Sequence, residues 1–397
     1  MRSDTKCYYP YTDNDIFDYS TTLYESKAVE IIANHDQSSP LFLYMPFQAV
    51  HDPFDDVASF YDVKDAVPDA IKTMIGTYVK GAKRTEYVYA LYIMDQAVGS
   101  IKTALENTGM MDNTYLIFAS DNGGCNGAGG KMAPYRGTKG SLFEGGTKVD
   151  AFVYSPLLDT SLVGTSFDKL FHVTDWFPTI VDMAGIDFEP RTGFELDGVS
   201  QVKAWKTGTA ARTVMLYNSA YNVKERDFQY ASNSAFAIRN ERFKLIHYFN
   251  SSYYAGWYDS SAVSEDDEGD NESECSATSS YSFLGDYTKA LFDLQNDPYE
   301  TTNLYDSSKG GISVVKSQLY SLIDYYNMRS RQDLVKSVKA MDAALTAWDG
   351  ANGYIVPFED SEGDDEKTAF ASTYPQFCEP KLGGKSSMTG GVTLGRR

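Results

Sequence analysis

The sequence predicts an α/β protein with a mainly parallel sheet, followed by a smaller α+β subdomain with an antiparallel sheet. Short apolar runs at 40–47, 114–120 and 149–154 have the length and composition of buried strands. Between the first two, apolar residues recur at spacings of three and four over 91–105, which is typical of an amphipathic helix. Strands and helices that alternate in this way usually build a parallel sheet with helices on its faces.

The pattern of apolar residues changes near residue 205. From there on, strand-like runs are interrupted by turn signals such as the one at 239–241, which predicts an antiparallel sheet. The runs span 213–217, 236–249 and 290–294. A stripe of apolar residues at helical spacing follows over 312–326, so we expect one helix beside this sheet.

The composition limits the classes of partner. The chain has 55 acidic and 35 basic residues and a net charge of −20, and such a surface repels nucleic-acid phosphates. We therefore expect no nucleic-acid partner, and any site for an anion needs a local group of cations. No apolar run reaches the roughly 20 residues that span a bilayer, and the N-terminus has no signal-peptide pattern. Sequons at Asn250 and Asn271 permit glycosylation.

Asp121 and Asn122 directly follow the strand predicted at 114–120. Ligand sites in α/β folds gather at the carboxyl ends of strands, and a carboxylate beside an amide carbonyl suits a hard divalent cation. Because two glycines come next, the same residues also fit an ordinary turn. The dipeptide alone leaves both interpretations open.

Two other side chains lie after predicted strands and could bind or protonate an anion. His51 follows the strand at 40–47, where an imidazole can hydrogen-bond or protonate an oxyanion; a structural histidine is the alternative. Lys139 lies in the glycine-rich stretch 136–148, where an ammonium group suits a tetrahedral anion and glycines permit close approach of the backbone. A flexible basic loop on the surface is the alternative for Lys139.

Several motifs occur in order along the chain. The candidate residues lie in three of them: PLFLYMPFQAVHDPF, TYLIFASDNGG and RGTKGSLFEGG. Three more follow along the chain: HVTDWFPTIVDMAG, LDGVSQVKAW and LFDLQNDPYETTNLY. Together they resemble the type I sulfatases of the arylsulfatase B kind over roughly residues 15–330. The resemblance implies an alkaline-phosphatase-like fold with a mixed, mainly parallel sheet flanked by helices. It also implies hydrolysis of sulfate esters of carbohydrates or aryl compounds.

The resemblance implies a role for each candidate residue. Asp121 and Asn122 match two ligands of a calcium ion. Lys139 matches a lysine that contacts the substrate sulfate, and His51 matches a histidine on the side of the leaving group. By the same resemblance, the substrate is a sulfated small molecule or glycan, and the protein belongs to the secretory pathway, in lysosomes or outside the cell.

Four other residues match family motifs without a reactive role. We interpret His172 and Asp175 as packing residues at the entry of a helix. Arg136 and Glu144 match residues of the glycine-rich loop, where we expect them to act as scaffolding rather than as reactants.

The nucleophile of these enzymes is a cysteine in the motif C-x-P-x-R that is converted to formylglycine. The four cysteines of this sequence lie in other contexts: Cys7, Cys125, Cys275 and Cys378. We therefore expect a C-terminal sulfatase fragment without its nucleophile, inactive as this chain, in which the resemblance also leaves Cys378 unpaired. The alternative is a noncatalytic sulfatase-like binding or interaction protein. A metal phosphatase or phosphodiesterase is disfavoured because the additional histidine motifs of those enzymes are missing.

The resemblance also names the predicted domains. Residues 1–205 form the C-terminal part of the catalytic domain, 206–335 the α+β subdomain, and 336–397 an extension with a polar tail. No pattern in the sequence indicates the oligomeric state.

Overall fold

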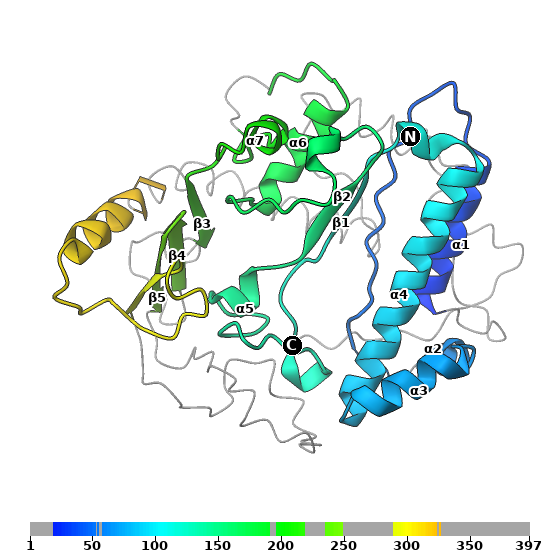
Figure 1. Ribbon diagram of the computed structural model, residues 1–397, viewed down its shortest axis with the longest axis horizontal. Helices are drawn as coiled ribbons and strands as arrows, with labels where there is room; N and C mark the ends of the chain where they lie inside the picture. Colours follow the sequence, from blue (N-terminus) through cyan, green and yellow to red (C-terminus); the bar gives the residue numbers. More distant parts are fainter. Residues whose placement is uncertain are drawn as a thin grey trace, which may run out of the picture. The chain divides into compact units, whose positions relative to one another are not determined.

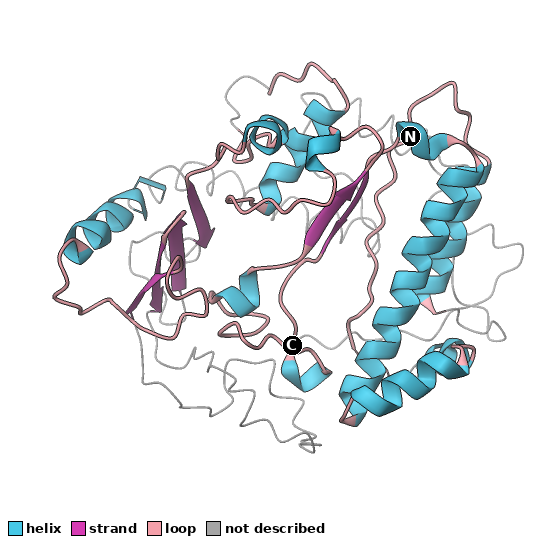
Figure 2. Ribbon diagram, viewed as in Figure 1, coloured by secondary structure: helices cyan, strands magenta, loops and turns pink. Residues whose placement is uncertain are grey.

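The structure, a computed structural model, describes most of the chain between residues 19 and 326. The described ranges are 19–52, 54, 58–190, 196–218, 235–248, 289–323 and 325–326. They all lie in the compact unit Phe17–Met328. This unit contains helices and two antiparallel sheets (Figures 1 and 2). The tail at 336–397, Cys378 and both sequons fall outside the described residues, and the domain boundaries stay a prediction.

Helices dominate the first part of the unit. The long helix α4 (Ala82–Asn107) packs along α1 (Ser20–Ala33), and α2 (Ala58–Asp65) and α3 (Asp69–Tyr78) pack against its N-terminal half. The core of this group surrounds Phe60, which is fully buried. The helix predicted over 91–105 is confirmed as the second half of α4. Within the described ranges, no helix combines the length and the apolarity needed to cross a bilayer.

Two of the strands predicted for the main sheet are present, with a different pairing and without the predicted burial: most of the second strand is exposed. β1 (Leu116–Ala119) and β2 (Ala151–Tyr154) form a two-stranded antiparallel sheet in which Leu116 lies opposite Tyr154. The prediction of parallel pairing is therefore wrong for these strands. Every strand pair in the described residues is antiparallel.

The prediction of a buried strand at 40–47 is wrong as well. This segment runs extended but pairs with no strand in the described part of the chain. Its side chains alternate: Leu41 and Leu43 pack on a small apolar cluster, whereas Phe42 and Tyr44 are 58% and 76% exposed. The pattern of a half-buried strand is present, but a strand also needs a neighbour to complete its backbone hydrogen bonds.

The antiparallel sheet predicted after residue 205 is confirmed. Its four strands follow one another in space as in sequence, in the order β3-β4-β5-β6. They are β3 (Val214–Asn218), β4 (Ala235–Asn240), β5 (Phe243–Tyr248) and β6 (Lys289–Asp293). β4 and β5 join through the predicted turn, so they form a hairpin.

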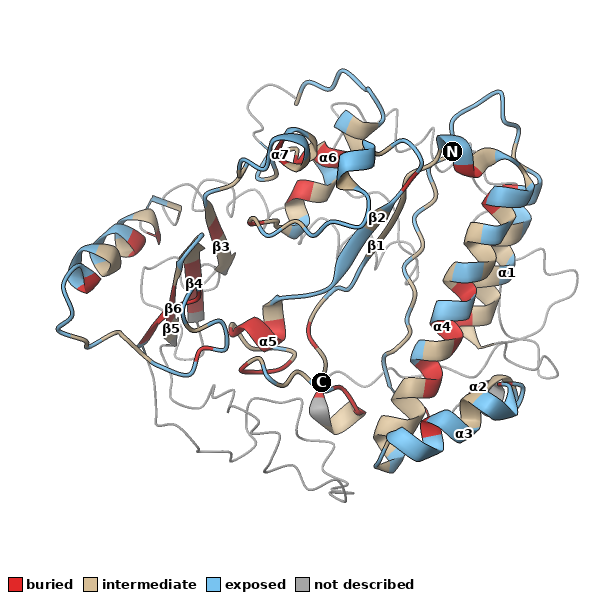
Figure 3. Ribbon diagram, viewed as in Figure 1, coloured by how far each residue is buried: buried red, intermediate tan, exposed pale blue. Residues whose placement is uncertain are grey.

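Both faces of this sheet are covered. Successive side chains of a strand point to opposite faces, so Leu245 and Ile246 enter different cores. Leu245 packs with the helix over 312–323, where a helix was predicted. Ile246 packs with Phe143, which comes from the glycine-rich stretch. The strands β4 to β6 and the short helix α5 (Glu144–Thr147) are accordingly among the most buried elements in Figure 3.

Asp175 closes the turn before α6 (Trp176–Met183), as expected for a residue at a helix entry. Its carboxylate accepts a hydrogen bond from the backbone N–H of His172 at 2.9 Å, forms an ion pair with Arg212, and is fully buried. Burial raises the pKa of Asp175, but the hydrogen bonds from Arg212 and the backbone outweigh it and hold that pKa below its usual value. A bond from the Gln201 side chain ties this turn to α7 (Val202–Thr207).

Amide hydrogen exchange should separate the two sheets. We expect faster exchange in β1, β2 and the segment 41–48 than in β4 and β5, by about tenfold or more, because few backbone groups in the first set are buried and paired on both sides. Peptide-level hydrogen–deuterium exchange of the purified chain measures this difference. Equal, strong protection in both sheets would contradict the expectation.

Candidate active site

His51 and Lys139 meet at the protein surface although they lie 88 positions apart in the sequence. Lys139 Nζ is 2.9 Å from His51 Nε2. His51 Nδ1 lies 2.6 Å from the carbonyl oxygen of Asp52. Because a carbonyl oxygen can only accept, Nδ1 carries the proton in this arrangement, and Nε2 accepts from the lysine ammonium.

Backbone hydrogen bonds join the loop of Lys139 to the loop that carries Asp121 and Asn122. The carbonyl oxygen of Gly124 accepts from Lys139 N at 3.0 Å, and Gly123 N donates to the carbonyl oxygen of Gly146 at 3.0 Å. The structure therefore brings His51 and Lys139 into contact and joins the two glycines after Asp121–Asn122 to the Lys139 loop.

The two loops approach so closely that only glycine fits between them. A Cβ atom on Gly123 would lie 1.8 Å from the carbonyl oxygen of Gly145, and one on Gly146 would lie 2.4 Å from that of Ser141 within its own loop. We predicted that these glycines permit a close approach of the backbone. The structure shows this approach between two loops of the chain itself.

Asp121 and Asn122 form a compact turn in which each side chain carries an oxygen atom that could bind a cation. One carboxylate oxygen of Asp121 accepts from Asn122 N at 2.8 Å, and Asn122 Nδ2 donates to the Gly123 carbonyl at 2.9 Å. The second carboxylate oxygen and the amide oxygen are suitable ligands for a hard cation. They are two of the six to eight oxygens that calcium takes. Among the described residues, no group of three or more His, Cys, Asp or Glu side chains could hold a metal ion.

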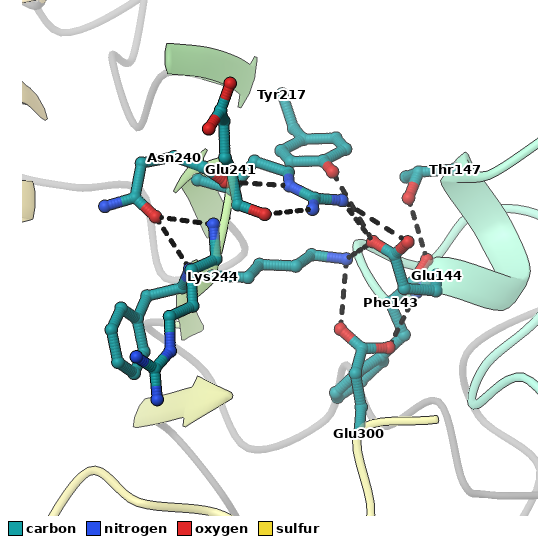
Figure 4. Close-up of polar contacts among 11 residues, drawn as sticks. Phe143, Glu144, Thr147, Tyr217, Asn240, Glu241, Lys244 and Glu300 are labelled. Atoms are coloured by element: carbon teal, nitrogen blue, oxygen red, sulfur yellow. Dashed lines mark hydrogen bonds and ion pairs between the residues drawn. The ribbon is translucent and has the colours of Figure 1, made fainter. Parts of the chain in front are cut away.

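A cluster of buried charged residues includes Glu144, which follows Lys139 in the glycine-rich stretch (Figure 4). Lys244 of β5 is fully buried, and its Nζ lies 2.9 Å from a carboxylate oxygen of Glu144 and 3.0 Å from one of Glu300. The other oxygen of Glu300 accepts from Glu144 N at 2.7 Å. Arg239 Nη1 is 3.4 Å from both oxygens of Glu144. We call Glu144, Arg239, Lys244 and Glu300 the buried charge cluster.

The members of this cluster differ in the direction in which their surroundings shift the pKa. Burial lowers the pKa of Lys244, but Glu300, Tyr217 and Glu144 raise it above its usual value, so the ammonium group stays charged. Burial raises the pKa of Glu144, but Lys244 and Arg239 hold it below its usual value. Burial raises the pKa of Glu300, and the nearby Glu144 raises it further. Lys244 lowers it, but the pKa of Glu300 stays above its usual value. Of the two glutamates, Glu144 is therefore the one whose negative charge the cluster stabilises.

The contacts of Arg136 and Glu144 agree with the scaffolding role predicted for them. Arg136 Nη1 donates to the backbone carbonyl of Glu300 at 3.1 Å, and Glu144 contacts the same residue through its amide. Lys244 and Glu300 were not predicted from the sequence as site residues, because a lysine in a strand and a glutamate in a loop are usually exposed. Cys125 is disulfide-bonded, and its partner lies outside the described residues.

The antiparallel sheets, the helices and the joined loops belong to the alkaline-phosphatase-like fold class, as predicted. PsFucS1 sulfatase from Pseudoalteromonas sp. shares this fold, with a TM-score of 0.55 at 19% identity over 83% of this chain and 56% of its own. Ps i-CgsB in complex with k-i-k-neocarrahexaose has a TM-score of 0.54 at 22% identity, over 78% of this chain and 56% of its own. At such identities the likeness concerns the fold alone.

The family follows from the sequence comparisons. The model of the Sulfatase family matches residues 2–186. Arylsulfatase J of Mus musculus is 30% identical over 324 residues, which are 79% of this chain and 49% of that protein. The chain therefore carries a sulfatase-family domain, and the resemblance to arylsulfatases is confirmed. It spans about half the length of Arylsulfatase J.

Replacing Gly123 tests how tightly the two loops pack. Gly123→Ala should lower the free energy of unfolding by about 1–3 kcal/mol, because the added methyl group meets backbone that cannot give way. Gly99→Ala in α4 is the matched control: nothing lies within 4 Å of its added Cβ, and it should stabilise the protein by about 0.5–1 kcal/mol. Urea denaturation measures both values. An equal effect of the two substitutions would mean that the loops lie farther apart than described.

Proposed function

We propose that this chain supplies the sulfate-holding part of the active site of a sulfuric ester hydrolase. The contact between His51 Nε2 and Lys139 Nζ carries the proposal. The protein has a net charge of −20, so its surface as a whole repels anions. The Lys139 ammonium group, which lies against the His51 ring at the end of a loop joined to its neighbour by backbone hydrogen bonds, provides the local attraction that a sulfate group requires.

The two residues have different roles in the proposed reaction. Lys139 binds a sulfate oxygen and stabilises its charge through the ammonium group. His51, in its protonated form, donates the Nε2 proton to the oxygen that leaves sulfur. The neutral ring that remains keeps its proton on Nδ1, against the carbonyl oxygen of Asp52, which is the tautomer that the observed contacts favour.

Asp121 and Asn122 would hold a calcium ion in this proposal. Their oxygens are of the right chemical type, and the backbone hydrogen bonds between the two loops support this assignment. When bound, the ion supplies positive charge for the sulfate oxygens. Turnover also needs the formylglycine nucleophile, and this sequence contains no C-x-P-x-R motif. The nucleophile would therefore have to come from a segment that this sequence does not include.

The substrate class and the compartment are part of the proposal. The sulfatase-family domain and the glycan named in the complex of Ps i-CgsB support a sulfated glycan or a smaller sulfate ester. The disulfide at Cys125 supports an oxidising compartment, since such bonds are rare in the reducing cytosol. The secretory pathway fits this requirement.

A second candidate function is a noncatalytic sulfatase-like protein that binds sulfated ligands. The missing C-x-P-x-R motif favours it. Both functions use the same anion site. They differ in whether the protein cleaves a chromogenic aryl sulfate when it is expressed with any additional coding sequence found upstream. Turnover supports the hydrolase, and binding without turnover supports the second candidate.

Sulfate binding tests the anion site directly. Lys139→Met should weaken the binding of inorganic sulfate and of phenyl sulfate by about tenfold, because a charge-assisted hydrogen bond is lost. Isothermal titration calorimetry on the full chain measures the affinities.

Lys148→Met is the matched control for Lys139→Met. It removes the same charge from the same loop, but its ammonium group lies over the ring of Tyr135, at 4.8 Å from the centroid. This control should change sulfate affinity far less. If both variants lose affinity equally, general electrostatics explains the binding, and the assignment of Lys139 fails.

Calcium binding tests the proposed ligands. Because the described residues supply two side-chain oxygens to this site, we expect a Kd on the order of 1 mM or weaker, and a further loss in Asp121→Asn. Asp112→Asn, at the opposite end of β1, should leave the affinity unchanged. Calorimetry with calcium chloride gives these values. Micromolar binding that survives in Asp121→Asn would mean that other residues hold the ion.

A further inference from the structure

The buried charge cluster connects three segments that lie far apart in the sequence. Glu144 comes from the Lys139 loop, Lys244 from the sheet and Glu300 from the loop after β6. A charge buried without a partner costs several kcal/mol, so these residues tolerate burial only together. The position of Glu144 is therefore set by Lys244 and Glu300.

The loop that carries Lys139 is held at both ends by Glu300. Its first residue, Arg136, donates to the Glu300 backbone carbonyl at 3.1 Å, and its guanidinium stacks over the ring of Phe143 at 4.5 Å. Near its other end, Glu144 N donates to the Glu300 carboxylate at 2.7 Å. Glycines between these anchors make the free loop costly to order, so the anchors must supply its rigidity.

A short series of backbone contacts leads from Glu144 to the anion site. The amide of Gly145 donates to the carbonyl oxygen of Arg136 at 2.7 Å, and the carbonyl oxygen of Gly146 accepts from Gly123 N at 3.0 Å. Lys139 N bonds to Gly124 in the same loop as Gly123. Because the glycines leave no space between the loops, a displacement of Glu144 has to move the backbone of Lys139.

We propose that Glu144 is a positioning residue for the anion site. Its carboxylate, held by Lys244 and Arg239, keeps the loop in the place from which the Lys139 ammonium reaches His51. Glu144 itself points into the buried cluster and acts only through Lys139 (Figure 4). The inference rests on the proposed function, because it assigns Glu144 a role in sulfate binding.

Glu144→Gln distinguishes positioning from general electrostatics by the sign of its effect. The variant removes a negative charge from an acidic protein, so electrostatics alone predicts tighter sulfate binding. Loss of positioning predicts weaker binding, by about tenfold, which is typical when a residue that orients a ligating group is changed. Calorimetry with inorganic sulfate on the full chain measures the change. Unchanged or tighter binding overturns the inference.

Asp293→Asn is the matched control for this experiment. It removes the same charge from a carboxylate that pairs with Arg242 of the same sheet, at 2.6 Å, without a contact to the Lys139 loop. Sulfate affinity should stay unchanged or rise slightly. If Glu144→Gln behaves like this control while Lys139→Met still weakens binding, only the inference fails. If the unmodified chain binds no sulfate, the inference and the proposed function fail together.

Glu144→Asp provides a readout that a purely structural role would not give. Both Glu144 variants should lower the thermal midpoint, but Glu144→Asp keeps the charge that Lys244 and Arg239 hold. We expect it to recover part of the sulfate affinity at a temperature where both variants are folded by circular dichroism. Affinity that follows only the thermal midpoints of the variants contradicts the inference.

A further pair of variants tests the inference if Glu144→Gln does not fold. Arg239→Gln removes one of the partners that hold Glu144, and Arg242→Gln removes the same charge from the same sheet away from the loop. Arg239→Gln should weaken sulfate binding more than Arg242→Gln does. An equal effect of the two overturns the inference.

Discussion

The ion pair between Lys244 and Glu144 is the interaction on which the candidate site depends. A fully buried ammonium group must keep its carboxylate partners, because losing one partner leaves an uncompensated charge and costs about 3–5 kcal/mol. The sheet therefore cannot pack in its native form unless the glycine-rich loop is in place beneath it. This ion pair is one of the contacts that couple the folding of the sheet to the placement of Lys139.

The same coupling explains how an acidic protein can offer an anion site. The net charge of −20 disfavours anions over the surface as a whole, so the site depends on a few cationic groups in fixed places. His51 is exposed and Lys139 half-buried, so their side chains alone would be mobile. Lys139 gains rigidity from its backbone, because Gly123 lets two loops pack in direct contact there.

Local patterns predicted much of the fold. The helical spacing of apolar residues located the second half of α4, and turn signals located the β4–β5 hairpin, because both depend on neighbours close in sequence. The segment 40–47 has the apolar run of a strand but no strand beside it in the described residues. The pairing of β1 with β2 likewise depends on contacts that no local pattern specifies.

By itself, the sequence determined the family and the candidate residues His51, Lys139, Asp121 and Asn122, because motifs preserve residue types at characteristic spacings. The tertiary structure alone decided that His51 reaches Lys139 and that Lys244 lies buried between two glutamates. A lysine in a strand has the same local pattern whether it faces water or a carboxylate. Its environment is set by segments a hundred residues away, and only folding brings them together.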